Sequence, residues 1–255
     1  RMDVLVHGKR ARQVGNICMD QCMFAVDTNP VRSYHRATPV AEGDLVKLDI
    51  GTHVEGYIAD TAVTINLGDH EKLCEAAQKA LDAAISVVKP ELVVSEIGKV
   101  VEETITSYGF KPIVNLTGHG LGRYSLHHGL SIPNTGLFGT GVLRNDSVIA
   151  IEPFATTGSG SVHEATRAEI YQVIGDAPVR SPTGRKILKK ADEMCGLPFS
   201  RRWLGIPKAE LAIPTLLKQG NLYDYHVLSD VAGSFVAQFE HTVIVTEDEP
   251  IVTTL

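Results

Sequence analysis

The sequence has 255 residues, of which 44% are apolar, and a formal net charge of -6. This length suits one large domain or two small ones, and the apolar fraction is ordinary for a globular protein. The negative charge, without a strong basic patch, argues against a nucleic-acid-binding groove. There is no run of about 18 apolar residues, and the first residues lack an apolar core, so we expect neither a membrane span nor a signal peptide.

The four cysteines are Cys18, Cys22, Cys74 and Cys195. Cys18 and Cys22 have no second pair that would complete a tetrahedral zinc site. We therefore expect four free thiols in a reducing compartment, which predicts a cytoplasmic protein.

Residues 1–44 carry a few apolar side chains without a clean period. Pro30 would break any helix that runs through it. His35 stands before a Thr-Pro pair and the turn-like Glu42-Gly43-Asp44. A lone histidine in this position is more often structural or exposed than functional, so this part of the sequence predicts little by itself.

The stretch from Leu45 to Leu67 reads LVKLDIGTHVEGYIADTAVTINL and predicts a β-hairpin. With the turn centred on Val54 and Glu55, Asp49 and Asp60 lie directly opposite each other, with Cβ atoms ~5 Å apart. Strand alternation then predicts two faces. The face expected to enter the core carries Val46, Leu48, Ile50, Val63, Ile65 and Leu67. The other face carries Leu45, Lys47, Asp49, Asp60, Ala62 and Thr64.

Two carboxylates on one small face repel each other. At ~4 Å and an effective dielectric constant of ~20, the repulsion is ~4 kcal/mol. Either one carboxylate binds a proton or a cation lies between the two. The alternative is a solvated hairpin edge on which Asp49 and Asp60 are unrelated.

Two core-facing helices are predicted after the hairpin. Asp69 is the expected N-cap of the first helix, which ends before Pro90. Ser95 is the expected cap of the second helix, which ends at Gly109. The first helix has an apolar stripe at helical spacing, formed by Leu73, Ala76, Ala77, Ala80, Leu81, Ala84, Val87 and Val88.

The segment VNLTGHGLGRYSLHHGLSIPN, residues 114–134, contains three histidines among glycines. No helix with a phosphate-facing start follows GHGLG, so it is not a dinucleotide fingerprint. Glycines on both sides of His119 leave room for a ligand or substrate. His127 and His128 are adjacent and should point to opposite sides of an extended chain, and the even spacing from His119 favours His127 for the same site.

Two further apolar strands each contain one glutamate. Ser147–Ala155 (SVIAIEPFA) contains Glu152, and Val236–Val245 (VAQFEHTVIV) contains Glu240. A carboxylate in such a strand is costly unless it is paired or bound to a cation. Both glutamates are therefore candidate functional residues.

Residues 176–224, between these strands, have a different pattern. They predict short helices at Gly184–Met194 and Pro207–Gly220, and Pro214 should kink or end the second. We interpret this stretch as a helical insertion in a single domain that spans residues 1–255.

Four acids and one histidine together suit a pair of divalent cations with bridging carboxylates. Paired cations lie ~3.5–4 Å apart, polarise a carbonyl and lower the pKa of a shared water. Hydrolysis then needs no serine or cysteine nucleophile, and no motif for either is present. Such a site accepts Mn²⁺, Fe²⁺, Co²⁺ or Zn²⁺.

From about Ala41 to Leu255 the sequence resembles the methionine aminopeptidases of type II, especially their short archaeal form. The resemblance rests on VKLDIGTHVEGYIADTAVT, NLTGHGLGRYSLHHGLSIPN, AIEPFATTGSGSV, LPFSRRWL and VAQFEHTVIV. It implies the α/β pita-bread fold, in which two pseudo-symmetric halves with antiparallel sheet surround a dinuclear metal centre. It also implies an enzyme that removes the initiator methionine from nascent chains when the next residue is small. We further predict a monomer, with the ribosome as a candidate partner.

The resemblance also implies roles for individual residues. The implied metal ligands are Asp49, Asp60, His119, Glu152 and Glu240, and Glu152 would also be the proton shuttle. His127 and His35 would contact the substrate near the scissile bond, and Leu126 and Tyr225 would line the methionine pocket. The amino-terminal part departs from the family pattern, because Phe24-Ala25-Val26-Asp27 replaces Phe-Pro-Val-Asn at a spacing to His35 that is one residue short.

Two alternatives within the same fold follow. One is an Xaa-Pro dipeptidase or a creatine-hydrolysing amidinohydrolase, which normally carries an extra amino-terminal domain. The 48 residues before Asp49 would leave no room for that domain. The other is a non-catalytic binding protein, which would have lost metal ligands that are all present here.

Overall fold

The computed structural model describes residues 3–6, 9–12, 16–27 and 41–255, with side chains from residue 41 onward except at 166 and 167. The predicted substrate histidine His35 lies outside the described residues. The first strands, β1 (Asp3–Val6) and β2 (Lys9–Arg12), pair with each other. A separate antiparallel sheet has the order β3-β4-β5 and is formed by β3 (Asn16–Asp27), β4 (Leu45–Val54) and β5 (Tyr57–Asn66).

The β4–β5 hairpin is present, but its predicted register is wrong. Its two-residue turn is Glu55-Gly56, with φ angles of 52° and 88°. Positive φ at both central residues matches the right-handed twist of the flanking strands, and glycine adopts it readily. Asp49 therefore pairs with Ala62 rather than with Asp60. The two aspartates are diagonal neighbours that still share one face.

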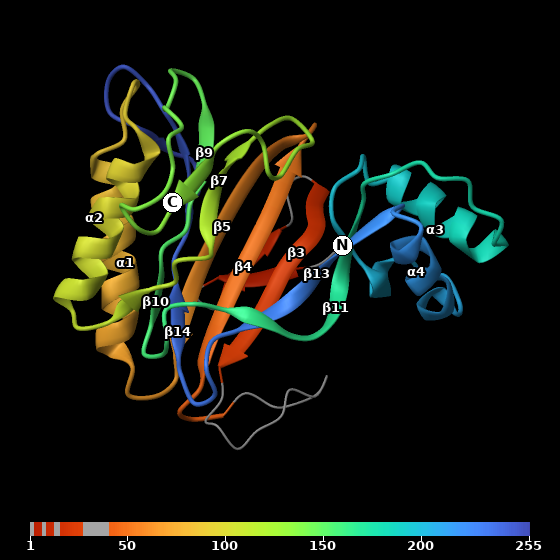
Figure 1. The fold of residues 1–255 in the computed structure, drawn as a ribbon, viewed down its shortest axis with the longest axis horizontal. Helices are drawn as coiled ribbons and strands as arrows, with labels where there is room; N and C mark the ends of the chain where they lie inside the picture. Colours follow the sequence, from red (N-terminus) through yellow and green to blue (C-terminus); the bar gives the residue numbers. More distant parts are fainter. Residues whose placement is uncertain (1–2, 7–8, 13–15, 28–40) are drawn as a thin grey trace.

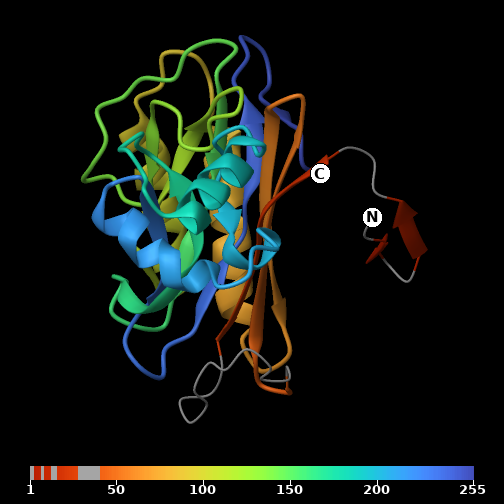
Figure 2. The ribbon, with the colours of Figure 1, turned by 90° about the vertical axis from the view of Figure 1, so that its right-hand side faces the viewer.

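The predicted burial of the hairpin faces is wrong for β5, although Val46 on the supposed core face of β4 is buried. The face that carries Asp49 and Asp60 is buried, with 8% and 2% of these residues exposed, whereas Val63 and Ile65 on the supposed core face are 42% and 41% exposed. In Figure 2 the hairpin is seen nearly edge-on, with most of the chain on one side of it. The carboxy-terminal segment covers the acidic face, since Lys47 Nζ donates to Val236 O at 3.1 Å and Gln238 Nε2 donates to Asp49 Oδ2 at 3.1 Å.

Helices α1 (Glu71–Ser86) and α2 (Val94–Ser107) lie side by side (Figure 1). The predicted α1 stripe is confirmed from Leu73 to Ala84, since these side chains are buried. The predicted caps are wrong: the N-caps are His70 and Val93, and neither makes a side-chain cap bond. At α2 the backbone N–H of the first helical residue donates instead to Gly141 O at 2.9 Å, so a tertiary contact replaces the side-chain cap.

Two antiparallel sheets lie beneath these helices. One has the order β16-β15-β9-β7-β8 and the other has the order β14-β10-β6. The first comprises β7 (Thr117–Leu121), β8 (Ser131–Pro133), β9 (Val148–Ile151), β15 (His241–Ile244) and β16 (Ile251–Val252). The second comprises β6 (Lys111–Pro112), β10 (Phe154–Thr156) and β14 (Val236–Gln238). Side chains from both sheets and both helices form the largest apolar core.

The two apolar stretches predicted as single strands are each divided. Glu152 lies between β9 and β10, and Glu240 lies between β14 and β15. Strand β9 pairs with β15 and β10 pairs with β14, so the two breaks face each other where the chain passes from one sheet to the other. Both glutamates therefore occupy the junction of two sheets rather than the interior of a strand.

The remaining elements form a layer beside the main body (Figure 1). A sheet of order β12-β11-β13 contains β11 (His163–Val173), β12 (Phe199–Ser200) and β13 (Leu222–Ser229). Helices α3 (Pro182–Asp192) and α4 (Ala209–Lys218) and the short 3₁₀ helix η1 (Arg201–Trp203) pack on it around a separate apolar cluster. Helices were predicted here, but α4 continues past Pro214 instead of ending there.

The mixed α/β class predicted from the sequence is confirmed by these helices and antiparallel sheets. Cys74 and Cys195, whose side chains the structure describes, are free thiols, as expected. Within the described part of the chain, the helices lack the length and apolar character that a membrane crossing needs.

Candidate metal centre

The structure brings the five predicted ligands together in two overlapping groups. Asp60, His119 and Glu240 form one group, and Asp49, Glu152 and Glu240 form the other. Within each group the potential ligand atoms all lie within 4.8 Å of one another. Glu240 belongs to both groups, which is the arrangement expected of a carboxylate that bridges two cations.

His119 lies on β7, between the acids of the hairpin and Glu152. Its Nε2 atom is 3.8 Å from Asp60 Oδ2 and 3.8 Å from Glu152 Oε1. These distances are too long for hydrogen bonds, and His119 and Asp60 belong to the same donor group. The other ring nitrogen, Nδ1, is 3.4 Å from Gly120 O. A ring nitrogen held by a carbonyl leaves Nε2 available as a ligand.

Asp60 is held in place by the carboxy-terminal strand β15. Its backbone N–H donates to Thr242 Oγ1 at 2.7 Å, and the same hydroxyl donates to Asp60 O at 2.8 Å. Thr61 Oγ1 donates to Glu240 O at 2.9 Å, which joins the next residue to the residue just before β15. Parts of the chain about 180 residues apart are thus fixed together at the site.

Sequence reasoning missed Gln238, which contacts two of the acids. Its Nε2 atom donates to Asp49 Oδ2 at 3.1 Å and to Glu152 Oε2 at 3.2 Å. Only 4% of Gln238 is exposed, and it lies two residues before Glu240. A buried amide in an apolar strand, on the same side as the glutamate by alternation, was the signal that could have identified it.

Burial raises the pKa values of all four carboxyl groups. The pKa of Asp49 rises to about 7 through desolvation and then through repulsion by Asp60, opposed by the Gln238 bond. Desolvation raises the pKa of Asp60 to about 6. The pKa values of Glu152 and Glu240 lie well above their ordinary range, through desolvation and then through repulsion by the other acids. Four such groups cannot all ionise together unless positive charge is added.

The imidazole of His119 is buried as a neutral group. Desolvation, followed by repulsion from His127, lowers the pKa of His119 to about 4. A neutral imidazole at pH 7 has a lone pair for a metal but adds no positive charge that would balance the acids. Asp60 Oδ1, moreover, is buried with no hydrogen-bond partner among the described residues. Oxygen-rich donors, a neutral imidazole and an unpaired carboxylate oxygen all fit divalent cations.

His127 stands at the solvent side of this cluster. Its ring is 4.6 Å from the ring of His119 and 6.2 Å from that of Tyr225. Partial desolvation lowers the pKa of His127, so the imidazole is neutral at pH 7. The ring of His128 lies against Gly122, whereas that of His127 lies against His119.

Two predicted pocket residues lie near His127: Leu126 precedes it in the chain, and Tyr225 is close to it in space. Leu126 is only 6% exposed and belongs to an apolar cluster with Ile58 and Leu197. Tyr225 lies on β13, and its hydroxyl donates to Gln172 Oε1 at 2.7 Å. Leu126 thus places apolar surface next to His127 in the chain, and the Tyr225 ring lies near the His127 imidazole.

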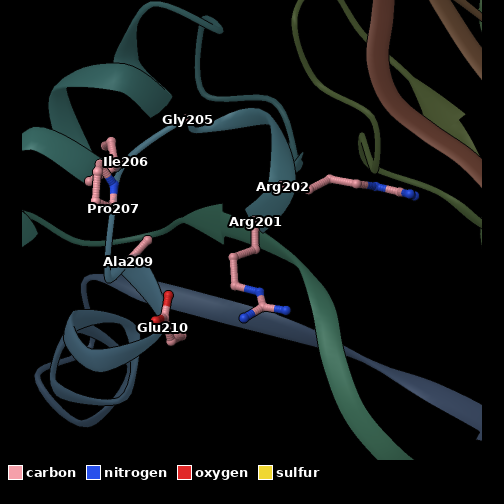
Figure 3. A pocket seen from close by; sticks show the side chains of 7 residues that line it. All are labelled: Arg201, Arg202, Gly205, Ile206, Pro207, Ala209 and Glu210. Atoms are coloured by element: carbon pink, nitrogen blue, oxygen red, sulfur yellow. The ribbon is translucent and has the colours of Figure 1, made fainter. Parts of the chain in front are cut away.

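A hollow of about 380 Å³ lies elsewhere, over η1 and the start of α4 (Figure 3). It is lined by Arg201, Arg202, Gly205, Ile206, Pro207, Ala209 and Glu210. Arg201 pairs with Glu169 at 2.9 Å. None of the predicted site residues lines this hollow.

Comparison with known proteins agrees with the geometry. The profile of the family described as Metallopeptidase family M24 matches residues 4–247. The chain is 50% identical over 241 residues to a methionine aminopeptidase of Archaeoglobus fulgidus, and the alignment covers 94% of this chain and 80% of that protein.

Solved structures show the same fold. The structure of a thermophilic Arx1 superposes with a TM-score of 0.76 at 19% identity, and the match covers 84% of this chain and 68% of that one. A methionine aminopeptidase from Thermotoga maritima gives a TM-score of 0.58 at 26% identity, covering 90% of this chain and 71% of that one. The likeness to the first shows the fold alone.

Proposed function

The chain belongs to metallopeptidase family M24, and from this premise we propose that it removes the N-terminal methionine from nascent proteins whose next residue is small. The observation that supports this most directly is the cluster of four acids and one imidazole in which Glu240 belongs to both donor groups. The enzyme is then a metal-dependent aminopeptidase, and its substrates are the free amino termini of new chains.

Two divalent cations fit the two donor groups. Asp60, His119 and Glu240 would hold one, and Asp49, Glu152 and Glu240 would hold the other. When bound, the cations supply Lewis acidity and a water molecule of lowered pKa. Mn²⁺, Fe²⁺, Co²⁺ and Zn²⁺ all suit these ligands.

Glu152 would move the proton during hydrolysis. Its side chain is 13% exposed, against 3% for that of Asp60, so it is the more accessible to an entering substrate. A carboxylate in this position would accept a proton from the attacking water and pass it to the leaving amine.

His127 would stabilise the negative charge that develops on the scissile carbonyl oxygen. As a neutral imidazole it can donate one N–H to that oxygen. Leu126 and Tyr225 would contact the methionine side chain through their apolar surfaces. His35 is proposed as a second substrate contact on the basis of the family resemblance.

Hydrolysis of Met-Ala-Ser and Met-Lys-Ser by protein supplied with Mn²⁺, Fe²⁺ or Co²⁺ tests the proposal. We expect rapid release of methionine from the first peptide and little from the second, because a long second side chain would not fit beside the acids. Equal turnover of both peptides, or of neither with any of these metals, would count against the proposal. An Xaa-Pro dipeptide in the panel tests the alternative dipeptidase.

Metal analysis of the purified protein tests the alternative of a non-catalytic binder, which would retain no divalent cation. A stoichiometry near two would agree with the two donor groups. The monomeric state, the cytoplasmic location and contact with the ribosome stay predictions. Light scattering measures the monomeric state, and co-sedimentation with ribosomes measures contact with the ribosome.

A further inference from the structure

The turn of the β4–β5 hairpin is bound to the loop that precedes His127. Tyr124 N–H donates to Gly56 O at 2.8 Å, and Arg123 Nε donates to Glu55 O at 2.9 Å. The Arg123 guanidinium lies 5.5 Å from the ring centre of Tyr57 and 5.7 Å from that of Tyr124. Both residues of the turn are therefore engaged by two consecutive residues of the loop.

The contact between Gly56 and Tyr124 is so close that a side chain at position 56 would force the Tyr124 ring to move. A Cβ atom built on Gly56 would lie 2.5 Å from two atoms of the Tyr124 ring. Tyr124 itself has a φ of 55°, an uncommon conformation for a bulky residue, which persists only where the surroundings hold it. The turn therefore supports a strained residue three positions before His127.

Backbone hydrogen bonds in the rest of the loop fix the chain on both sides of His127. Gly122 and Ser125 exchange backbone hydrogen bonds at 2.9 and 3.0 Å, which fixes the tight turn around Tyr124. Beyond His127, His128 N–H donates to Gly120 O at 2.8 Å, which ties the loop back to β7. His127 thus lies between two fixed points, one of which is held by the hairpin turn.

We propose that the Glu55-Gly56 turn, through Arg123 and Tyr124, is a positioning element for His127 and sets the distance of its imidazole from the acidic cluster. The inference rests on the proposed function for its effect on catalysis, because His127 acts there on the substrate. None of the turn residues belongs to the donor groups of the metal centre. Disturbing the turn should therefore reduce turnover without removing metal.

Gly56→Ala tests the inference, with Gly109→Ala as its matched control. The two glycines have φ angles of 88° and 85°, so alanine is similarly strained at both. Among the described residues, no atom lies within 4 Å of a Cβ built on Gly109, so that variant adds no contact. Misplacement of a substrate-positioning group by ~1 Å costs about 10²-fold. We expect Gly56→Ala to lower kcat/KM for Met-Ala-Ser by about that factor at unchanged metal content, and Gly109→Ala to lower it little.

The His127→Ala background separates positioning from general damage. If the turn acts through His127, adding Gly56→Ala to His127→Ala should cause no further loss of kcat/KM. An equal further loss, a loss of bound metal, or full activity of Gly56→Ala would overturn the inference. If Gly56→Ala does not fold, Arg123→Ala replaces it as the test variant. This substitution of an exposed residue removes only the hydrogen bond to Glu55 and the contacts with the two tyrosine rings.

A second measurement does not depend on activity. The imidazole signal of His127 in an NMR spectrum, assigned by its loss in His127→Ala, should shift in Gly56→Ala and stay unchanged in Gly109→Ala. If wild-type protein fails to cleave Met-Ala-Ser, the proposed function fails, but this shift still decides whether the turn positions His127. An unshifted signal would refute the positioning role even in an active enzyme.

Discussion

Replacing a predicted metal ligand should stabilise the metal-free protein. In Asp49→Asn the buried carboxylate becomes an uncharged amide of almost the same shape, which can still accept the bond from Gln238. The wild-type side chain must ionise in an 8% exposed position beside Asp60 when the pH is high and no cation is present. The variant avoids that cost, although it also loses a metal ligand and should be inactive.

The size of the effect follows from the pKa of Asp49. Its rise from 3.8 to about 7 in the folded protein corresponds to ~4 kcal/mol at ~1.4 kcal/mol per pKa unit. A raised carboxyl pKa means that the folded state binds more protons than the unfolded state between these values, so stability falls as the pH rises through that window. At pH 8 metal-free Asp49→Asn should be up to ~4 kcal/mol more stable than wild type, and at pH 5 the gap should shrink by ~3 kcal/mol.

Urea unfolding of chelator-treated proteins at pH 5 and pH 8 measures this difference. Asp230→Asn provides a contrast of opposite sign. Burial acts to raise the pKa of Asp230, but hydrogen bonds from Ser159, Thr156 and Val231 outweigh it and lower the pKa to about 2. That variant should lose ~2 kcal/mol at pH 8. If Asp49→Asn were no more stable than wild type at pH 8, or if the gap did not depend on pH, the electrostatic description of the site would be refuted.

Three further outcomes are expected. Glu240→Gln should lose metal from both donor groups, whereas Asp49→Asn keeps one group intact, and metal analysis after dialysis distinguishes them. Because raised carboxyl pKa values require protons to leave when a cation binds, Mn²⁺ affinity should rise from pH 5 to pH 8 with proton release, which calorimetry in two buffers detects. Gly98→Ala should destabilise the protein by ~1–3 kcal/mol in thermal unfolding, since its Cβ would meet Thr135 O at 2.2 Å; a gain in stability, as at an exposed helical glycine, would contradict this.

The sequence predicted the chemistry of the site better than its packing. Alternation placed Asp49 and Asp60 on one face. This prediction holds despite the register error, because the true partner of Asp49 is Ala62, two residues from Asp60, and a shift of two residues leaves each side chain on its face. The same rule misassigned the core, since it assumes that the apolar face is the buried one. Here the face that carries Asp49 and Asp60 is buried instead, because Asp49 accepts a hydrogen bond from Gln238 Nε2 and Thr64 Oγ1 donates one to Gln238 O. Polarity patterns cannot distinguish a buried functional face from a solvated one.

Other errors have similarly local causes. The Glu55-Gly56 turn was misplaced by one residue, although Gly56 is the position where a positive φ is easiest. The cap at Ser95 was wrong because a distant loop carbonyl satisfies the helix, and no local pattern reveals such a partner. Glu152 and Glu240 were assigned to continuous strands, since a change of sheet leaves no break in the apolar sequence.

The donor residues come from remote parts of the chain, and this sets the order of assembly. Gln238 and Asp49, which touch in the site, are 189 residues apart in sequence. A short metal-binding loop can capture its ion before the surrounding structure forms, but contacts of such long range form late in folding. Maturation should therefore proceed from a folded, metal-free intermediate whose central acids are partly protonated, and cation availability would govern how quickly newly made molecules become competent.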